Sequence, residues 1–260
     1  MESLPNKKKA LFIVEGAKRE VNFIRRLTSC AGIGMEIVSV CANIHMLYQS
    51  LKKENFYFNI VDMLLNLPGV SQKDKEKLKE KKSFAYTYLI FDLDLQHYDL
   101  SKPYNIQRGV EDVVEMINFF NDETDPTIGK IYVNYPMIES YRDCKSFFDD
   151  DYRYASVSLS NIGRYKEIVS ERGLSLNITK YSYENFKSLS KMNLYKFNYL
   201  DSNNWMKPEY EDYINKITQE RLIKIQNKLI INMGKISILN TSFFILLDYF
   251  GNRNNFYENL

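Results

Sequence analysis

Two aspartates stand at the end of an apolar run in the first half of the chain. Residues 86–91 are aromatic, aliphatic or β-branched, and Asp92 and Asp94 follow almost at once. A run with bulk on both faces is typical of a buried strand in a parallel sheet. Open α/β sheets bind ligands at the carboxyl ends of such strands, and side chains two apart on an extended chain point the same way. We therefore predict that both carboxylates face one spot.

Two neighbouring carboxylates need a compensating cation or a proton. At about 5 Å and an effective dielectric constant near 20 they repel by roughly 3 kcal/mol. A bound cation, or protonation of one acid, removes that repulsion. Hard oxygen ligands favour Mg²⁺ or Mn²⁺ over zinc. The structural alternative is that aspartate is also a common turn residue at the end of a strand.

Strands and helices alternate on both sides of this pair. Short apolar or β-branched runs predict strands, and helical spacing of apolar residues predicts helices. Strands are predicted over 9–14, 35–40, 86–91 and 131–134, and helices over 17–29 and 110–120. Pro136 fits the first turn of a further helix. The alternation predicts an α/β fold with a mostly parallel sheet, flanked by helices and joined by right-handed crossovers.

The chain divides into two predicted parts. Residues 1–150 form the α/β part, with a helical insertion at about 42–84 that ends in the highly charged stretch 73–82. Beyond residue 151 the pattern becomes mainly helical and predicts a C-terminal extension over 151–260. It contains helices near 165–171 and 209–233, an aromatic and basic stretch over 181–207, and an apolar closing segment over 237–250.

Composition gives no global charge signal for a partner, so any basic surface must be local. Lys and Arg number 35 against 33 Asp and Glu, a net charge of +2, so no global field favours a nucleic acid or a membrane surface. The closing apolar segment is too short to span a bilayer. Cys30, Cys41 and Cys144 have no metal-ligand spacing and are expected to be reduced thiols. A cytoplasmic protein without a membrane anchor is the expectation.

Acidic residues also follow the first and last predicted strands. Glu15 ends the first strand, with Gly16 permitting a sharp turn, and Glu139 comes shortly after the last. Parallel strands bring their carboxyl ends to one edge of the sheet. Glu15, Asp92, Asp94 and Glu139 are therefore expected to converge although they are far apart in sequence.

Three strings carry a resemblance to a known family. They are Ile13-Val-Glu-Gly-Ala-Lys-Arg-Glu20, Phe91-Asp-Leu-Asp-Leu-Gln96 and Asn134-Tyr-Pro-Met-Ile-Glu139. Their order resembles the Toprim pattern of topoisomerases, primases and related nucleases. The first string is similar to the opening of Toprim nucleases of the OLD type and of small Toprim proteins from phage-defence islands. The resemblance covers about residues 9–145 and implies a Toprim-like fold for the α/β part.

The resemblance also implies roles for the acids. Glu15 would handle a proton or a metal-bound water, and Asp92 and Asp94 would hold Mg²⁺ or Mn²⁺. Glu20 and Glu139 would be supplementary ligands or position water. Such a site supports phosphodiester hydrolysis, in which divalent ions activate water and offset charge on the phosphate.

Basic residues near these acids are candidates for binding a nucleic acid substrate. Lys18 and Arg19, with Arg25 and Arg26, lie on the helix after Glu15, whose amino terminus also attracts phosphate. The pattern fixes no lysine that would stabilise the transition state. Lys18, Arg142 and Lys145 are the candidates for that role.

The leading hypothesis is a Mg-dependent Toprim nuclease that acts on RNA or DNA. From the resemblance we expect a toxic effector of antiphage defence, with tRNA as one candidate target. Such a toxin needs an inhibitory or regulatory partner, for which an ATPase is one candidate, and a homodimer is a further option. The alternative is a catalytically silent Toprim-like module that binds a protein partner or nucleic acid. A hydrolase of the haloacid dehalogenase kind is the third hypothesis.

Several of these residues also have purely structural interpretations. Glu15 and Glu139 could be ordinary acids at helix starts, and Glu20 a solvated helix residue. His45 and His97 are isolated histidines, for which a core or surface position is the simplest explanation. The aromatic and basic stretch from Tyr181 to Trp205 could stack bases or could belong to the core.

Overall fold

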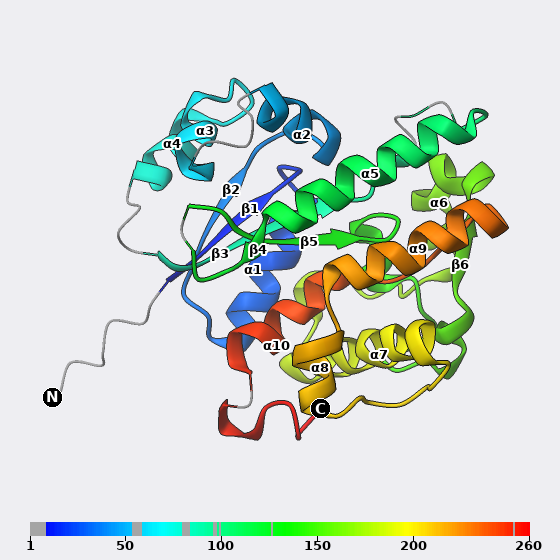
Figure 1. Cartoon of the computed structure of the whole chain (residues 1–260). Helices are drawn as coiled ribbons and strands as arrows, with labels where there is room; N and C mark the ends of the chain where they lie inside the picture. Colours follow the sequence, from blue (N-terminus) through cyan, green and yellow to red (C-terminus); the bar gives the residue numbers. More distant parts are fainter. Residues whose placement is uncertain are drawn as a thin grey trace, which may run out of the picture.

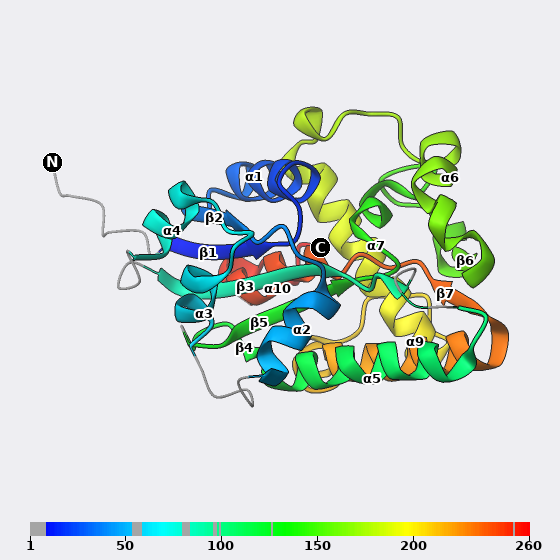
Figure 2. The same cartoon turned by 90° about the horizontal axis from the view of Figure 1, so that it is seen from above.

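A five-stranded, mostly parallel sheet forms the centre of the protein (Figures 1 and 2). The computed structural model describes residues 9–53, 59–79, 84–95, 98, 100–125, 127–251 and 253–260, so that Gln96 and His97 lie outside the described residues. The strand order is β2-β1-β3-β5-β4, and only the short β4 runs antiparallel to its neighbour. The strands are β1 (Lys9–Val14), β2 (Met35–Ser39), β3 (Phe84–Asp92), β4 (Asn121–Asp122) and β5 (Gly129–Asn134). The predicted α/β class with a mostly parallel sheet flanked by helices is confirmed.

Helices cover both faces of the sheet (Figure 2). Helix α1 (Arg19–Ala31) lies on one face and α5 (Pro103–Phe119) on the other. The cause is the strand order, because the step from β1 to β2 and the step from β3 to β5 run in opposite directions. Right-handed crossovers in opposite directions place their helices on opposite faces.

The predicted insertion consists of three short helices. They are α2 (Ile44–Lys53), α3 (Ile60–Asn66) and α4 (Gln72–Lys79). Helix α4 carries residues 73–79 of the charged stretch, and residues 80–82 lie outside the described residues. It buries Leu78 alone of its residues, as a solvated helix should. Helix α2 packs against α5, and its buried residues include His45.

The part after residue 150 is mainly helical. Its elements are α6 (Tyr165–Arg172), α7 (Tyr183–Ser202), α8 (Tyr210–Lys216), α9 (Gln219–Met233), α10 (Phe244–Phe250) and a two-stranded antiparallel sheet of β6 (Ser156–Ser158) and β7 (Lys235–Ser237). Helix α7 packs against α1, and α9 packs against α5. The segment before α10 completes the end of β5, because Thr241 Oγ1 donates to Val133 O at 2.9 Å and Ser242 Oγ to Asn134 Oδ1 at 3.0 Å.

Two predicted helices differ from the structure. The predicted single helix over 209–233 is broken between α8 and α9, because the Thr218 hydroxyl accepts a hydrogen bond from Arg221 N at 3.1 Å and caps α9. The helix predicted after Pro136 is a short 3₁₀ helix, Ile138–Arg142, and the Tyr135–Pro136 peptide bond is cis.

Lys196 lies wholly inside the C-terminal part. Its ammonium donates to the carbonyl oxygens of Tyr152, Arg153 and Ala155 at 2.8, 2.8 and 3.0 Å. Burial lowers its pKa to about 7; nearby Lys235 also lowers it, and Asp143 opposes the shift. This lysine therefore joins α7 to the 3₁₀ helix Asp150–Tyr154 and the residue before β6.

None of the helices in the described ranges is both long enough and apolar enough to cross a membrane. This agrees with the expectation drawn from the short closing apolar segment.

Candidate functional site

Strand pairing brings Glu15 to the end of β3. Val14 lies opposite Ile90, and the chain continues in register, because Glu15 N donates to Ile90 O at 3.3 Å. On the other side of β3, Asp92 lies opposite Asn134. The carboxyl ends of β1, β3 and β5 therefore form one edge of the sheet, as expected for parallel neighbours.

Glu15, Asp92 and Asp94 are in close contact at this edge. The carboxylate Oε2 of Glu15 accepts a hydrogen bond from Asp92 N at 3.3 Å, and the charge of the neighbouring Asp94 acts on Glu15. Both aspartates are 5% exposed. Asp94 has a φ of 53° and lies beyond the end of β3 at Asp92. The prediction that both aspartates point the same way because they alternate on an extended strand is therefore wrong in its reason. The turn itself directs Asp94 toward Glu15.

Burial and mutual repulsion raise the pKa values of two of these acids. For Glu15 the causes are burial, then the charge of Asp94, then that of Glu20. For Asp92 burial again comes first, followed by the charges of Glu15, Asp94 and Glu20, and Lys166 opposes the shift. Four acids thus share one electrostatic environment, which favours protons or a cation over four free carboxylates.

Glu20 reaches this environment by lying against the backbone of Gly16. A Cβ atom on Gly16 would stand 2.5 Å from Glu20 Oε2. Because any other residue at position 16 would displace that carboxylate, the glycine serves the position of Glu20. The φ of Gly16 is not positive, so the turn after β1 does not depend on the conformational freedom of glycine, contrary to the prediction.

The turn between Asp92 and Asp94 is held from both sides. Leu93 N donates to the carbonyl oxygens of Asn134 and Pro136, each at 3.1 Å. Leu93 O is 3.1 Å from Nε2 of His45, and Nδ1 of that histidine is 3.0 Å from the Tyr98 hydroxyl, which donates to Asp112. His45 is therefore a core histidine, in agreement with the structural interpretation, and its contact with Leu93 O holds the backbone between the two aspartates. The sequence did not predict this contact, because His45 lies on α2, far along the chain from Leu93.

Glu139 lies beside two cations. Its side chain is 2% exposed and forms an ion pair with Arg19, while Lys166 Nζ is 3.9 Å from Glu139 Oε1. Lys166 also acts on Asp92, so it links Glu139 electrostatically to the acids of β1 and β3. Sequence reasoning missed Lys166, which lies on α6 in the C-terminal part and belongs to none of the three strings.

The other predicted substrate-binding residues lie in different surroundings. Lys18 is exposed just before α1. Arg142 Nη2 donates to Ser170 Oγ at 3.0 Å, and Lys145 Nζ pairs with Asp151 at 2.8 Å with its side chain 73% exposed. The contacts of Arg142 and Lys145 thus tie them to the C-terminal part, and their roles stay predictions.

Helix α7 forms most of the aromatic and basic stretch. Its apolar residues are largely core: Phe186, Leu189, Met192, Leu194 and Phe197 are buried. The helix also carries a cation–π contact, because Lys191 Nζ lies 5.9 Å from the centroid of the Phe148 ring and 5.8 Å from that of the Tyr195 ring. The core interpretation therefore accounts for most of the stretch.

The donor set at the sheet edge suits a hard divalent ion. Asp92 Oδ1 and Glu139 Oε2 are buried, and neither has a hydrogen-bond partner among the described residues. Carboxylate oxygens of this kind are the ligands that Mg²⁺ and Mn²⁺ prefer. In the described part of the chain, however, no three Asp, Glu, His or Cys side chains are arranged to hold an ion as they stand. Ion binding therefore requires these side chains to rearrange.

The chain matches no family model, no curated protein and no solved structure.

Proposed function

We propose that the chain is a Toprim-fold nuclease that hydrolyses phosphodiester bonds in RNA or DNA with Mg²⁺ or Mn²⁺. The observation that carries the proposal is the gathering of Glu15, Asp92 and Asp94 at the carboxyl edge of a parallel sheet, with raised pKa values for the first two. Perturbed acids that gather at such an edge are typical of functional sites.

Each residue has a definite part in this proposal. The carboxylates of Glu15, Asp92 and Asp94 would hold the ion, and Glu20 and Glu139 would position its outer ligands. A bound divalent ion supplies an activated water and positive charge for the scissile phosphate. Lys166 and Arg19, next to Glu139, would bind the phosphate and orient it.

The biological setting in the proposal rests on the sequence resemblance alone. It makes the chain a toxic effector of antiphage defence, acting in the cytoplasm, with tRNA as one candidate substrate. A protein partner would hold it inactive, with an ATPase as one candidate, and a homodimer is a further option for its assembly.

A catalytically silent Toprim-like module is the second candidate, and one observation favours it. Arg19 already compensates Glu139, and no ready-made group of three ligands exists among the described residues. A module that binds a protein or a nucleic acid would tolerate this arrangement, whereas the nuclease must open it.

Metal titration separates the two candidates. Calorimetry of the full chain with MnCl₂ and MgCl₂ should show binding at millimolar concentrations or below, with Glu15→Gln and Asp92→Asn weakening it at least tenfold. Glu184→Gln is the matched control, because its carboxylate is 73% exposed on α7. Cleavage of labelled tRNA, single-stranded RNA and DNA should then require metal and both acids. Absence of metal binding favours the silent module, and metal-independent cleavage excludes both.

A further inference from the structure

A cavity of about 440 Å³ lies away from the acid edge, between the sheet and the C-terminal helices. Its walls come from the end of α5, from β4 and β5, and from α8, α9 and α10. Lys130 lies near the start of β5, whereas Asn134 ends that strand at the acid edge. Four residues of extended chain separate the two by roughly 13 Å. None of the predicted site acids lines the cavity, so it is a separate feature, and its volume is in the range of small-molecule sites.

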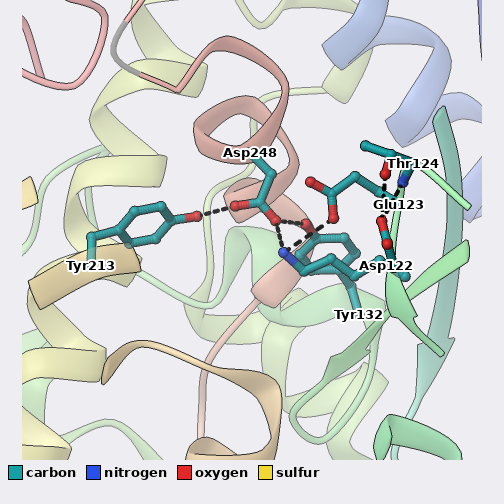
Figure 3. Close-up of polar contacts among 7 residues, drawn as sticks. Asp122, Glu123, Thr124, Tyr132, Tyr213 and Asp248 are labelled. Atoms are coloured by element: carbon teal, nitrogen blue, oxygen red, sulfur yellow. Dashed lines mark hydrogen bonds and ion pairs between the residues drawn. The ribbon is translucent and has the colours of Figure 1, made fainter. Parts of the chain in front are cut away.

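Part of the cavity lining is a charged cluster of Glu123, Lys130 and Asp248. Figure 3 shows the polar contacts of Glu123 and Asp248. Lys130 forms an ion pair with Asp248, and its Nζ is 3.6 Å from Glu123 Oε2. The hydroxyl groups of Tyr132 and Tyr213 both donate to Asp248, one to each carboxylate oxygen. Both carboxylate oxygens of Asp248 thus accept hydrogen bonds, and Asp248 also pairs with Lys130. Glu123 has only the same Lys130 as its ion-pair partner among the described residues.

The cluster carries one more negative charge than positive. Asp248 and Glu123 both pair with Lys130, and the described residues offer them no second ion pair. Burial works against the charge of Lys130, but the two carboxylates outweigh it and raise its pKa. The Glu123 side chain is 22% exposed, so the surplus charge stands where water screens it poorly. A cation in the cavity would compensate it, and an anion would be repelled.

The remaining walls are aromatic and aliphatic. Tyr210 and Phe244 face the cavity, together with Ile117, Ile214 and Ile217. The faces of aromatic rings attract cations and also pack against apolar groups. Ile214 is apolar but 56% exposed, so a ligand could cover it. A ligand that buried these side chains would therefore gain hydrophobic contact and bring its charge to the carboxylates.

We propose that this cavity binds a small organic cation, an amine or guanidinium carried on an apolar or aromatic body. Glu123 recognises the positive group, and the tyrosine, phenylalanine and isoleucine side chains bind the body. This site does not depend on the nuclease proposal, because it uses none of the acids at the sheet edge.

The test compares three ligands that share one skeleton. Tyramine carries an ammonium, tyrosol carries a hydroxyl in its place, and 4-hydroxyphenylacetate carries a carboxylate. Calorimetry on the full chain should give a tyramine affinity at least tenfold above that of tyrosol, with no binding of the acid. Equal affinities of tyramine and tyrosol, or no binding of tyramine at millimolar concentration, would overturn the proposal.

Two variants locate the binding. Glu123→Gln should weaken tyramine binding roughly ten- to a hundredfold, as expected for a hydrogen bond to a charged group. Glu111→Gln, an exposed residue on α5 outside the cavity, should leave it unchanged. Lys130→Met should have the opposite effect, because removing the lysine leaves both carboxylates uncompensated. Tyramine should then raise the melting temperature of Lys130→Met more than that of the parent. Unchanged binding by Glu123→Gln would place tyramine elsewhere and refute the assignment, as would a smaller rise for Lys130→Met.

Discussion

Replacing Asp92 by asparagine should stabilise the metal-free protein while removing its response to metal. Asp92 is 5% exposed, and the acids around it raise its pKa together with burial. In EDTA at neutral pH Asp92 destabilises the fold whether its carboxyl group is ionised or protonated. It is ionised against Glu15 and Asp94, or it holds a proton that the unfolded chain would release. Asparagine has nearly the same shape and carries neither cost.

The size of the gain follows from the repulsion. Two carboxylates about 5 Å apart repel by roughly 3 kcal/mol at an effective dielectric constant of 20, and partial protonation reduces this to about 2 kcal/mol. For a chain of this length, 1 kcal/mol corresponds to about 2–4 °C in melting temperature. Asp92→Asn should therefore melt about 4–8 °C above the parent in EDTA.

Differential scanning fluorimetry in EDTA and in 10 mM MgCl₂ provides the assay. The parent should gain stability with Mg²⁺ by the usual linkage between binding and folding, and Asp92→Asn should gain little. Glu184→Gln, the exposed control on α7, should follow the parent in both buffers. A variant that melts at or below the parent temperature in EDTA would show that Asp92 is not under repulsion, and the electrostatic basis of the site would fail.

Three further predictions concern the surroundings of the site and the C-terminal part. His45→Phe removes the contact with Leu93 O and should lower metal affinity by about tenfold at nearly unchanged helix content, which calorimetry and circular dichroism measure; unchanged affinity would leave His45 a packing residue only. Lys166→Met should reduce cleavage at least a hundredfold while Mn²⁺ still binds, and full activity would exclude Lys166 from the site. The folded pKa of Lys196 is lowered to about 7 from its ordinary value of 10.5. Between these two pH values the unfolded chain binds more protons than the folded chain, so the contribution of this group to stability rises with pH. The unfolding free energy of the parent minus that of Lys196→Met should therefore rise by about 2.3 kcal/mol in total from pH 7 to 9 in urea titrations. A constant difference would show that the three carbonyls keep the lysine charged throughout.

The strands that form the acid edge were predictable because their signal is local. The apolar runs that predicted β1, β2, β3 and β5 also fix which ends carry Glu15 and Asp92. Parallel pairing then requires those ends to meet. The position of Asp94 was not predictable in the same way. Its direction comes from a positive φ after the strand, which neighbouring sequence does not specify.

The missed features depend on contacts between distant parts of the chain. Lys166 approaches Glu139 only because α6 packs beside the 3₁₀ helix Ile138–Arg142. The two residues of β4 are too few to show a pattern. The break before α9 had a usable signal, since a threonine three residues before Arg221 fits an N-cap. The apolar periodicity continued across Thr218 and concealed it.

Arg19 has one positive charge, and in the resting protein it is committed to Glu139. A phosphate that binds this guanidinium competes for its positive charge with a carboxylate that is almost wholly shielded from water, although the Arg19 side chain is 57% exposed and has further N–H groups to offer. The carboxylate then needs another positive neighbour, and Lys166 is the nearby side chain that can move closer. If the proposed nucleic acid substrate binds at Arg19, the charges around Glu139 would thus differ between the free and the bound protein.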